Sequence, residues 1–276
     1  MNILWAVLIT AAVTAVAVGA MLYVRARAPE GSYFTDGDRA SGVFGVLATG
    51  FSILLGFVVF LAFTSYDNSR SGAETEALMV LQQVETAQSF PAPTGPKVTR
   101  ELVCYGRSVV NEEWDRMRAG TLGDGVNPWG VRLFETVSGY EPKTNHEQAA
   151  YDAWLSQTSA REEARLDRVH ASSGVIPVTL WIVLFVIGGV IFAYMLFFAD
   201  SREPRRTQAM LMGSVMVVIT TLFLLLVSLD RPYHSGVGSL KPTAMERSLR
   251  IVDHALEAVG AGVKAPCNET GVGPAS

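Results

Sequence analysis

The sequence has few charged residues and few cysteines for its length. Of its 276 residues, 17% are charged and 49% are hydrophobic, whereas about 25% are charged in an ordinary soluble domain. This balance excludes a disordered chain, which combines low hydrophobicity with high net charge. The chain also lacks a basic surplus, because 22 Lys and Arg residues face 26 Asp and Glu residues, and this excludes a nucleic-acid-binding protein. Two cysteines, Cys104 and Cys267, are too few for a disulfide scaffold. The remaining class is a membrane protein.

Four segments contain no Asp, Glu, Lys or Arg, and each is long enough to cross about 30 Å of hydrocarbon. A charge at the centre of such a helix costs about 2.5–3.5 kcal/mol on insertion, so we interpret the four segments as transmembrane helices. They are residues 2–24, 42–65, 174–199 and 209–229. We expect the first to be a retained anchor rather than a cleaved signal peptide, because its positive charges follow the apolar run.

The predicted fold is all-α, a polytopic membrane protein with a helical extramembrane bundle between the second and third spans. Outside the membrane, apolar residues recur at intervals of three and four, which indicates helices. The second membrane helix is expected to continue to about residue 88, and further helices are expected over about 98–117, 128–137 and 146–170. The predicted organisation is a first hairpin over 1–65, the bundle over 66–173, a second hairpin over 174–229, a post-membrane segment with an amphipathic helix over 230–259, and a flexible tail over 260–276.

The orientation follows from the basic residues in the short loops. Six arginines lie in the loops after the first and third spans, whereas Arg231 and Lys241 are the basic residues just after the fourth span. Because short cytoplasmic loops carry the excess of Lys and Arg, both short loops are predicted to be cytoplasmic. The N terminus, the bundle and the C-terminal tail are then extracytoplasmic.

Cys104 and Cys267 would both lie on that oxidising side, where a disulfide can form. A bridge would tie the tail to the bundle. The alternative is two unrelated thiols, because pairing cannot be deduced from sequence alone.

Several short motifs resemble one family over nearly the whole chain. They are Gly56-Phe57-Val58-Val59-Phe60, Glu76-Ala77, Glu113-Trp114, Ile176-Pro177, Leu180-Trp181 and Leu229-Asp230-Arg231-Pro232-Tyr233, the last running on through Gly236 to Pro242. Together they resemble the bestrophin-like membrane proteins of bacteria and plants. The resemblance implies a relation to bestrophins, which are pentameric anion channels with their bulk in the cytoplasm, opposite to the orientation that the loop charges predict.

A stripe of small residues marks one face of the second span. Gly42, Gly45, Thr49, Ser52 and Gly56 are spaced three or four apart, which lets another backbone approach closely. This face could line a narrow pore or an oligomer axis, or it could serve packing within the chain. Among the flanking aromatic residues, Phe57 and Phe60 are candidates for a hydrophobic gate, and lipid-facing or core side chains are the alternative.

Charged residues cluster where the second and fourth spans end. Asp67 and Arg70 follow the second span, and Asp230 and Arg231 follow the fourth. Such charges could form a ring at a pore mouth or a structural network at the membrane rim. Two denser acidic patches, Glu112–Asp115 and Glu162–Asp167, are interpreted as solvated helix faces. No HExxH, GxSxG or phosphate-loop motif is present, so we predict no enzyme and assign no catalytic residue, cofactor or metal.

Two functions remain open. The first is a homo-oligomeric ion channel, for anions, with the second span near its axis. The second is a non-conducting accessory or scaffold subunit of a membrane complex that binds a partner through its outer bundle. The spans contain no ionisable side chain, which argues against pumps and ion-coupled transporters. The expected partners are the lipid bilayer and either further copies of the chain or a membrane complex, and no nucleic acid.

Overall fold

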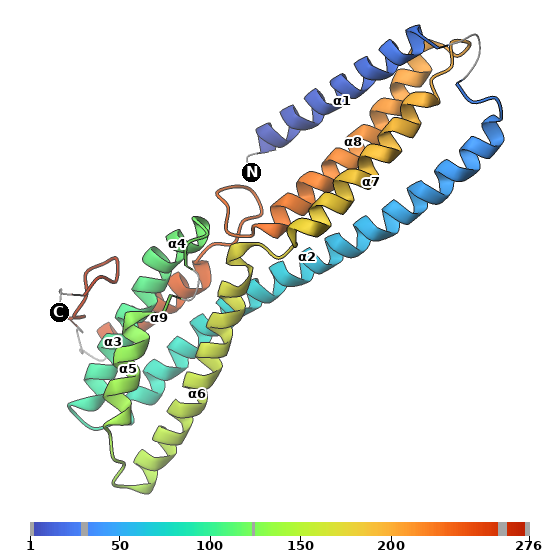
Figure 1. The fold of residues 1–276 in the computed structure, drawn as a ribbon. Coiled ribbons are helices and arrows are strands. Elements are labelled where there is room, and N and C mark those ends of the chain that lie inside the picture. The colour runs from blue at the N-terminus through green and yellow to red at the C-terminus, as the bar shows by residue number, and fades with distance from the viewer. Residues whose placement is uncertain (1–2, 29–32, 123–124, 259–263, 274–276) are drawn as a thin grey trace. The chain divides into compact units, whose positions relative to one another are not determined.

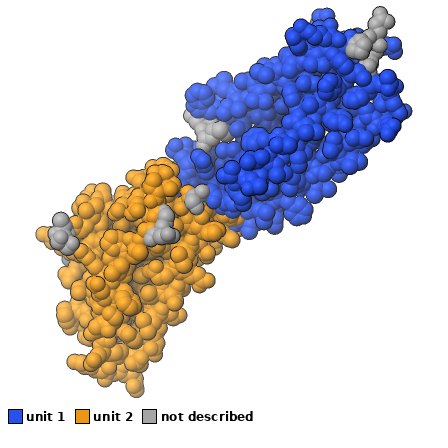
Figure 2. All heavy atoms as spheres, viewed as in Figure 1, with its two compact units in different colours: residues 1–64, 174–238 blue, residues 65–173, 239–276 orange. Residues whose placement is uncertain are grey.

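The regular structure is helical in the computed structural model, which describes residues 3–28, 33–122, 125–258 and 264–273 (Figure 1). No strand occurs within these ranges. The chain forms two compact units (Figure 2): residues 1–64 and 174–238 are here called the membrane unit, and residues 65–173 and 239–276 the bundle unit. Four of the described helices are long and apolar enough to cross a membrane. The predicted all-α fold with four spans is confirmed.

The four spanning helices are α1 (Ile3–Ala26), α2 (Gly37–Ala87), α7 (Val178–Phe197) and α8 (Arg205–Asp230). Residue 2 of the first predicted span lies outside the described residues. Helix α2 begins before the predicted residue 42 because Asp36 Oδ1 accepts a hydrogen bond from the Arg39 amide at 3.0 Å, which caps the helix start. Helix α7 begins later than predicted, since Gly174 has a φ of +84° and extended Pro177 precedes the first turn.

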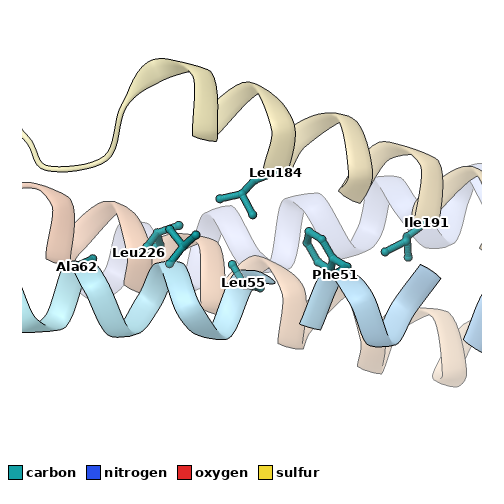
Figure 3. Packing of buried hydrophobic residues seen from close by; sticks show 7 residues of the cluster. Phe51, Leu55, Ala62, Leu184, Ile191 and Leu226 are labelled. Carbon is teal, nitrogen blue, oxygen red and sulfur yellow. The ribbon is translucent and has the colours of Figure 1, made fainter. Parts of the chain in front are cut away.

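Two apolar clusters hold the membrane unit together. In the first, α2 packs against α7 and α8 (Figure 3) through Phe51, Leu55, Val58, Ala62, Leu184, Ile191 and Leu226. In the second, α1 packs against α7 and α8, and its fully buried members are Ala17, Met21, Ala199 and Met212. Both clusters lie along the spans, so apolar packing joins these helices over their length.

The bundle unit contains the second part of α2 and the remaining helices. They are α3 (Thr94–Ser108), a π-helical turn (Val109–Glu113), α4 (Trp114–Arg118), α5 (Pro128–Ser138), α6 (Asn145–His170) with a 3-10 turn (Ala171–Ser173), and α9 (Thr243–Ala258). The helix expected over about 98–117 corresponds to α3, the π turn and α4, so helical structure starts earlier, at Thr94, and a π turn interrupts it. The early start is possible because Pro96 lies in the first turn, where a missing amide donor costs nothing.

The C-terminal parts of the chain dock on α3. Helix α9 buries Met245 and Val252, and a Cβ on Gly106 would lie 2.8 Å from Leu249 Cδ2, so glycine permits this close approach. Residues 264–273, part of the tail predicted to be flexible, pack on α3 and α5 through the contacts described below. Residues 259–263 and 274–276 of the predicted segments lie outside the described residues.

Candidate functional site

The small residues of α2 lie on a face that the other described helices leave open. Gly42, Gly45, Thr49, Ser52 and Gly56 are all exposed. A Cβ added at Gly42, Gly45 or Gly56 would meet nothing within 4 Å. Within the described chain, therefore, these glycines do not serve close helix packing. We call these five residues the small-residue face.

The two aromatic gate candidates lie farther along the same helix. Phe57 and Phe60 each expose 64% of their surface, whereas Phe51 is buried in the cluster with α7 and α8. Phe51 thus packs within the chain, whereas Phe57 and Phe60 face outward. No described contact assigns a gate to Phe57 and Phe60, which remain candidates.

An apolar groove lies between α2 and α8, bordered by α7 at Ile191. Its volume is about 520 Å³. It is lined by Phe44, Ala48, Phe51, Ser52, Leu55, Gly56, Val59, Ile191, Ser214, Val215, Val218, Ile219 and Leu222. The hydroxyls of Ser52 and Ser214 donate to carbonyl oxygens of their own helices at 2.8 and 2.9 Å, so both donors are satisfied. The structure brings Ser52 and Gly56 of the small-residue face to the edge of this groove.

The rim charges have local partners. Asp230 is 8% exposed, and its Oδ1 accepts hydrogen bonds from the amides of Val175 and Ile176, each at 2.8 Å. Val175 and Ile176 precede Pro177, the N-cap of α7, so this carboxylate fixes the segment that leads into α7. Arg70 pairs instead with exposed Glu74 at 3.1 Å, one turn along α2. Asp230 and Arg231 belong to the membrane unit and Asp67 and Arg70 to the bundle unit, so a shared charge ring remains a prediction.

A buried ionic network lies inside the bundle unit, and the sequence analysis missed it. Arg168, fully buried on α6, binds both carboxylate oxygens of Glu76 on α2 and donates to Glu113 Oε2 at 2.6 Å. Arg165 donates to Glu113 Oε1 at 2.9 Å. The Tyr105 hydroxyl donates to Glu76 Oε1 at 2.6 Å. The network joins α2, α3, α6 and the π turn.

The network sets the protonation states of its members. Burial alone would raise the pKa of Glu113, but the guanidinium groups of Arg168 and Arg165 outweigh burial and lower it below its usual value. Burial opposes the charge on Arg168, yet Glu76 and Glu113 raise its pKa. Burial and the neighbouring Glu76 raise the pKa of Tyr105. Glu113, Arg165 and Arg168 are therefore charged at neutral pH.

The interpretation of Glu112–Asp115 as a solvated face was wrong for Glu113, which is 4% exposed. Glu112 and Asp115 are exposed as expected. The overlooked signal is on α6, where Arg161, Arg165 and Arg168 follow one another at intervals of four and three and are all buried. Three arginines on one helix face indicate a partner of opposite charge if that face is buried.

Cys104 and Cys267 are joined by a disulfide in the structure, with Cα atoms 5.8 Å apart. Cys104 lies in α3 with no exposed surface, and Cys267 lies in the C-terminal segment 264–273. Among the described residues, no three His, Cys, Asp or Glu side chains come together in a way that could hold a metal ion. The site residues with the clearest geometry are thus the small-residue face, the ionic network and the disulfide.

Comparison with known proteins identifies the fold. The model of the Bestrophin-like domain matches residues 10–245. A bacterial Bestrophin homolog from Klebsiella pneumoniae is similar over 94% of this chain and 99% of its own, with a TM-score of 0.66 and 13% identity. A mutant of that homolog gives the same TM-score and identity and is covered over its full length. These identities are low enough that the likeness concerns the fold. No curated protein matches the chain.

Proposed function

Because the chain belongs to the Bestrophin-like family, we propose that it forms a homo-oligomeric ion channel, for anions, with α2 near the pore axis. Its motifs resemble those of the bestrophin-like membrane proteins, and the relation to bestrophins, which are pentameric anion channels, that this resemblance implies supports ion conduction. The observation that carries the proposal is the small-residue face, which lies within a span and is covered by no other described helix. Small residues at such a position allow α2 helices of several copies to approach a common axis.

The chemistry of the spans fits a passive pore. The four predicted spans hold no Asp, Glu, Lys, Arg or His side chain, so conduction would depend on backbone groups, hydroxyls and charges at the pore ends. In this arrangement Phe57 and Phe60 narrow the pore and Asp67, Arg70, Asp230 and Arg231 surround its mouth. Substitutions at these residues are expected to change the conductance without changing the fold.

The first experiment is the oligomeric state of the purified protein in nanodiscs, measured by native mass spectrometry. A closed ring supports the channel and leads to bilayer recordings under chloride and potassium gradients, where the reversal potential is expected to follow chloride. A monomer contradicts the channel.

Ser52→Leu tests the axial position of α2, because leucine fills space that the small-residue face leaves open. Thr64→Leu is the matched control, since Thr64 is also an exposed hydroxyl residue of α2 bonded to its own helix. We expect Ser52→Leu to disrupt the ring or to reduce conductance at least tenfold, and Thr64→Leu to do neither. Unchanged assembly and conductance in Ser52→Leu would exclude α2 from the axis.

We also propose that the bundle unit is extracytoplasmic. The loop arginines support this orientation, and so does the disulfide, which persists in oxidising compartments. The test places single cysteines in a Cys104→Ser/Cys267→Ser background, at exposed Glu163 in the bundle unit or exposed Arg202 in the α7–α8 loop. In intact cells, an impermeant thiol reagent should label Glu163→Cys alone, and Arg202→Cys only after lysis. The reverse pattern would invert the topology.

A second candidate function is an accessory subunit that binds a partner through the bundle unit. It is favoured by Val131 and Phe134, neighbouring residues of α5 that expose 44% and 68% of their surface. Copurification of a second, stoichiometric protein with the wild type but not with Phe134→Ser would support this function. A homomeric ring in which Phe134→Ser conducts normally would reject it.

A further inference from the structure

We propose that residues 264–273 form a redox-controlled strap, which the Cys104–Cys267 disulfide holds closed over the bundle unit and which reduction releases. This inference concerns the bundle unit alone and does not depend on ion conduction. The disulfide closes a separation of 163 residues, so it joins the C-terminal segment to a helix far earlier in the chain.

The strap lies on a seat formed by α3, the π turn and α5. Trp129 Nε1 donates to the carbonyl oxygen of Gly271 at 2.7 Å, and this bond is buried. Arg107 and Asn111 donate to the carbonyl oxygens of Asn268 and Glu269, each at 3.4 Å. All three donors are side chains that bind main-chain oxygens. The seat therefore binds mainly the main chain of the strap and few of the strap's side chains.

The shape of the strap suits this seat. Asn268 Oδ1 accepts hydrogen bonds from the amides of Thr270 and Val272 at 3.0 and 2.9 Å and so forms a tight turn. Gly271 follows with a φ of +84°, and a Cβ there would lie 2.3 Å from the Ser108 amide nitrogen. Only glycine permits both this conformation and this approach to α3. The strap is thus a built contact and not an accidental one.

The non-covalent contacts between strap and seat are few. In the part of the chain that the structure describes, one short and two long hydrogen bonds connect them. The side chains at 264, 266, 268–270 and 272 are exposed, so the strap buries little apolar surface. Segments with few buried apolar contacts open most readily. The covalent bond is therefore what keeps the strap ordered.

The chemistry of release is thiol–disulfide exchange with a dithiol as the reductant. Cys104 has no exposed surface and Cys267 is partly exposed, so the attacking thiolate reaches Cys267 Sγ and Cys104 leaves as a thiolate. The second thiol of the reductant then displaces Cys267, and each leaving thiolate takes up one proton. The protein gains two electrons and two protons, and the dithiol becomes a disulfide.

Release is expected to affect more than the tail. Asn111, which binds the strap, belongs to the same π turn as Glu113, and Glu113 is bonded to Arg165 and Arg168. π turns interrupt helices frequently at functional sites. Opening the strap removes the hydrogen bond between Asn111 and Glu269 from the π turn, and this turn positions the Glu113 carboxylate of the ionic network. The effect of release is expected to end at the π turn, because Arg168 on α6 is also held by Glu76 on α2.

The test is hydrogen–deuterium exchange of the full chain in nanodiscs, before and after dithiothreitol, with reduction verified by intact mass. Peptides from residues 264–273 are expected to exchange at least tenfold faster after reduction, while peptides from the centre of α6 change less than twofold. Cys104→Ser/Cys267→Ser should behave like the reduced protein without added reductant. Trp129→Phe keeps the disulfide and removes the short hydrogen bond, and its strap should stay protected until reduced.

Two results would overturn the proposal. Exchange of the strap within twofold of the oxidised value, in fully reduced protein, would show that the non-covalent contacts suffice. Faster exchange of α6 to the same degree as the strap would show that the disulfide supports the whole bundle unit rather than a releasable segment.

Discussion

Removing the central guanidinium of the buried network should destabilise the bundle unit strongly. In Arg168→Met, Glu76 keeps the Tyr105 hydroxyl but loses both guanidinium contacts, and Glu113 keeps Arg165. Removing one partner of a buried ion pair costs about 3–5 kcal/mol, because an uncompensated charge is left inside. That is a large fraction of the about 5–15 kcal/mol that stabilises a typical domain.

Hydrogen–deuterium exchange of α6 in nanodiscs measures this loss. Since about 1.4 kcal/mol corresponds to a factor of ten, exchange from the open state should accelerate about 10²- to 10⁴-fold. The double variant Arg168→Met/Glu76→Gln removes the stranded carboxylate as well and should recover most of the loss. Arg70→Met, which breaks the exposed pair with Glu74, is the control and should exchange like the wild type.

The reasoning would be refuted by either of two outcomes. Arg168→Met with exchange within tenfold of the wild type would mean that water or another group compensates the carboxylates. A double variant no more stable than the single one would mean that packing of the Arg168 side chain, and not its charge, is what the bundle unit requires.

Three further outcomes follow from other contacts. Because the pKa of Glu113 is lowered in the folded state, its charge stabilises the bundle unit above the ordinary carboxyl value of about 4.3 and this contribution is lost as the pH falls further. The melting temperature should therefore decrease as the pH is lowered below this value. In Glu113→Gln, the melting temperature should depend less on pH in the same acidic range. Gly95→Ala should lower the melting temperature, because its Cβ would lie 2.6 Å from two carbonyl oxygens, whereas Gly189→Ala, in open space, should not; equal melting temperatures would contradict the packing. Asp230→Ala should cost about 1–3 kcal/mol, because the amides of Val175 and Ile176 in the segment before α7 lose their acceptor. The loss is measured as faster hydrogen–deuterium exchange of that segment, and unchanged protection would contradict it.

Local sequence patterns were sufficient to predict where the helices lie in the chain. The end of α2 at Ala87 follows from apolar residues that continue at helical spacing up to a run of prolines. The amphipathic stripe after the fourth span likewise corresponds to α9, whose buried residues include Met245 and Val252. Such patterns are visible because helix formation depends on residues within a few turns of one another.

Glu113 shows where local patterns fail. Its neighbours Glu112 and Asp115 are solvated, so the acidic run is typical of an exposed face. The π turn and the arrival of α6 place Glu113 alone in the interior. The C-terminal segment is a similar case: its Gly, Ala and polar residues predict a flexible tail, whereas its bond to Trp129 joins residues that are far apart in the chain.

By itself the sequence determined the class of protein, the four spans and the helices outside them, since each depends on hydrocarbon thickness, charge cost and helical period along a continuous stretch of chain. The tertiary structure alone decided which side chains meet. Arg168 reaches Glu76 across 92 residues and Cys104 meets Cys267 across 163. Such pairs depend on how helices distant in the chain pack against each other, a property that no local window of residues contains.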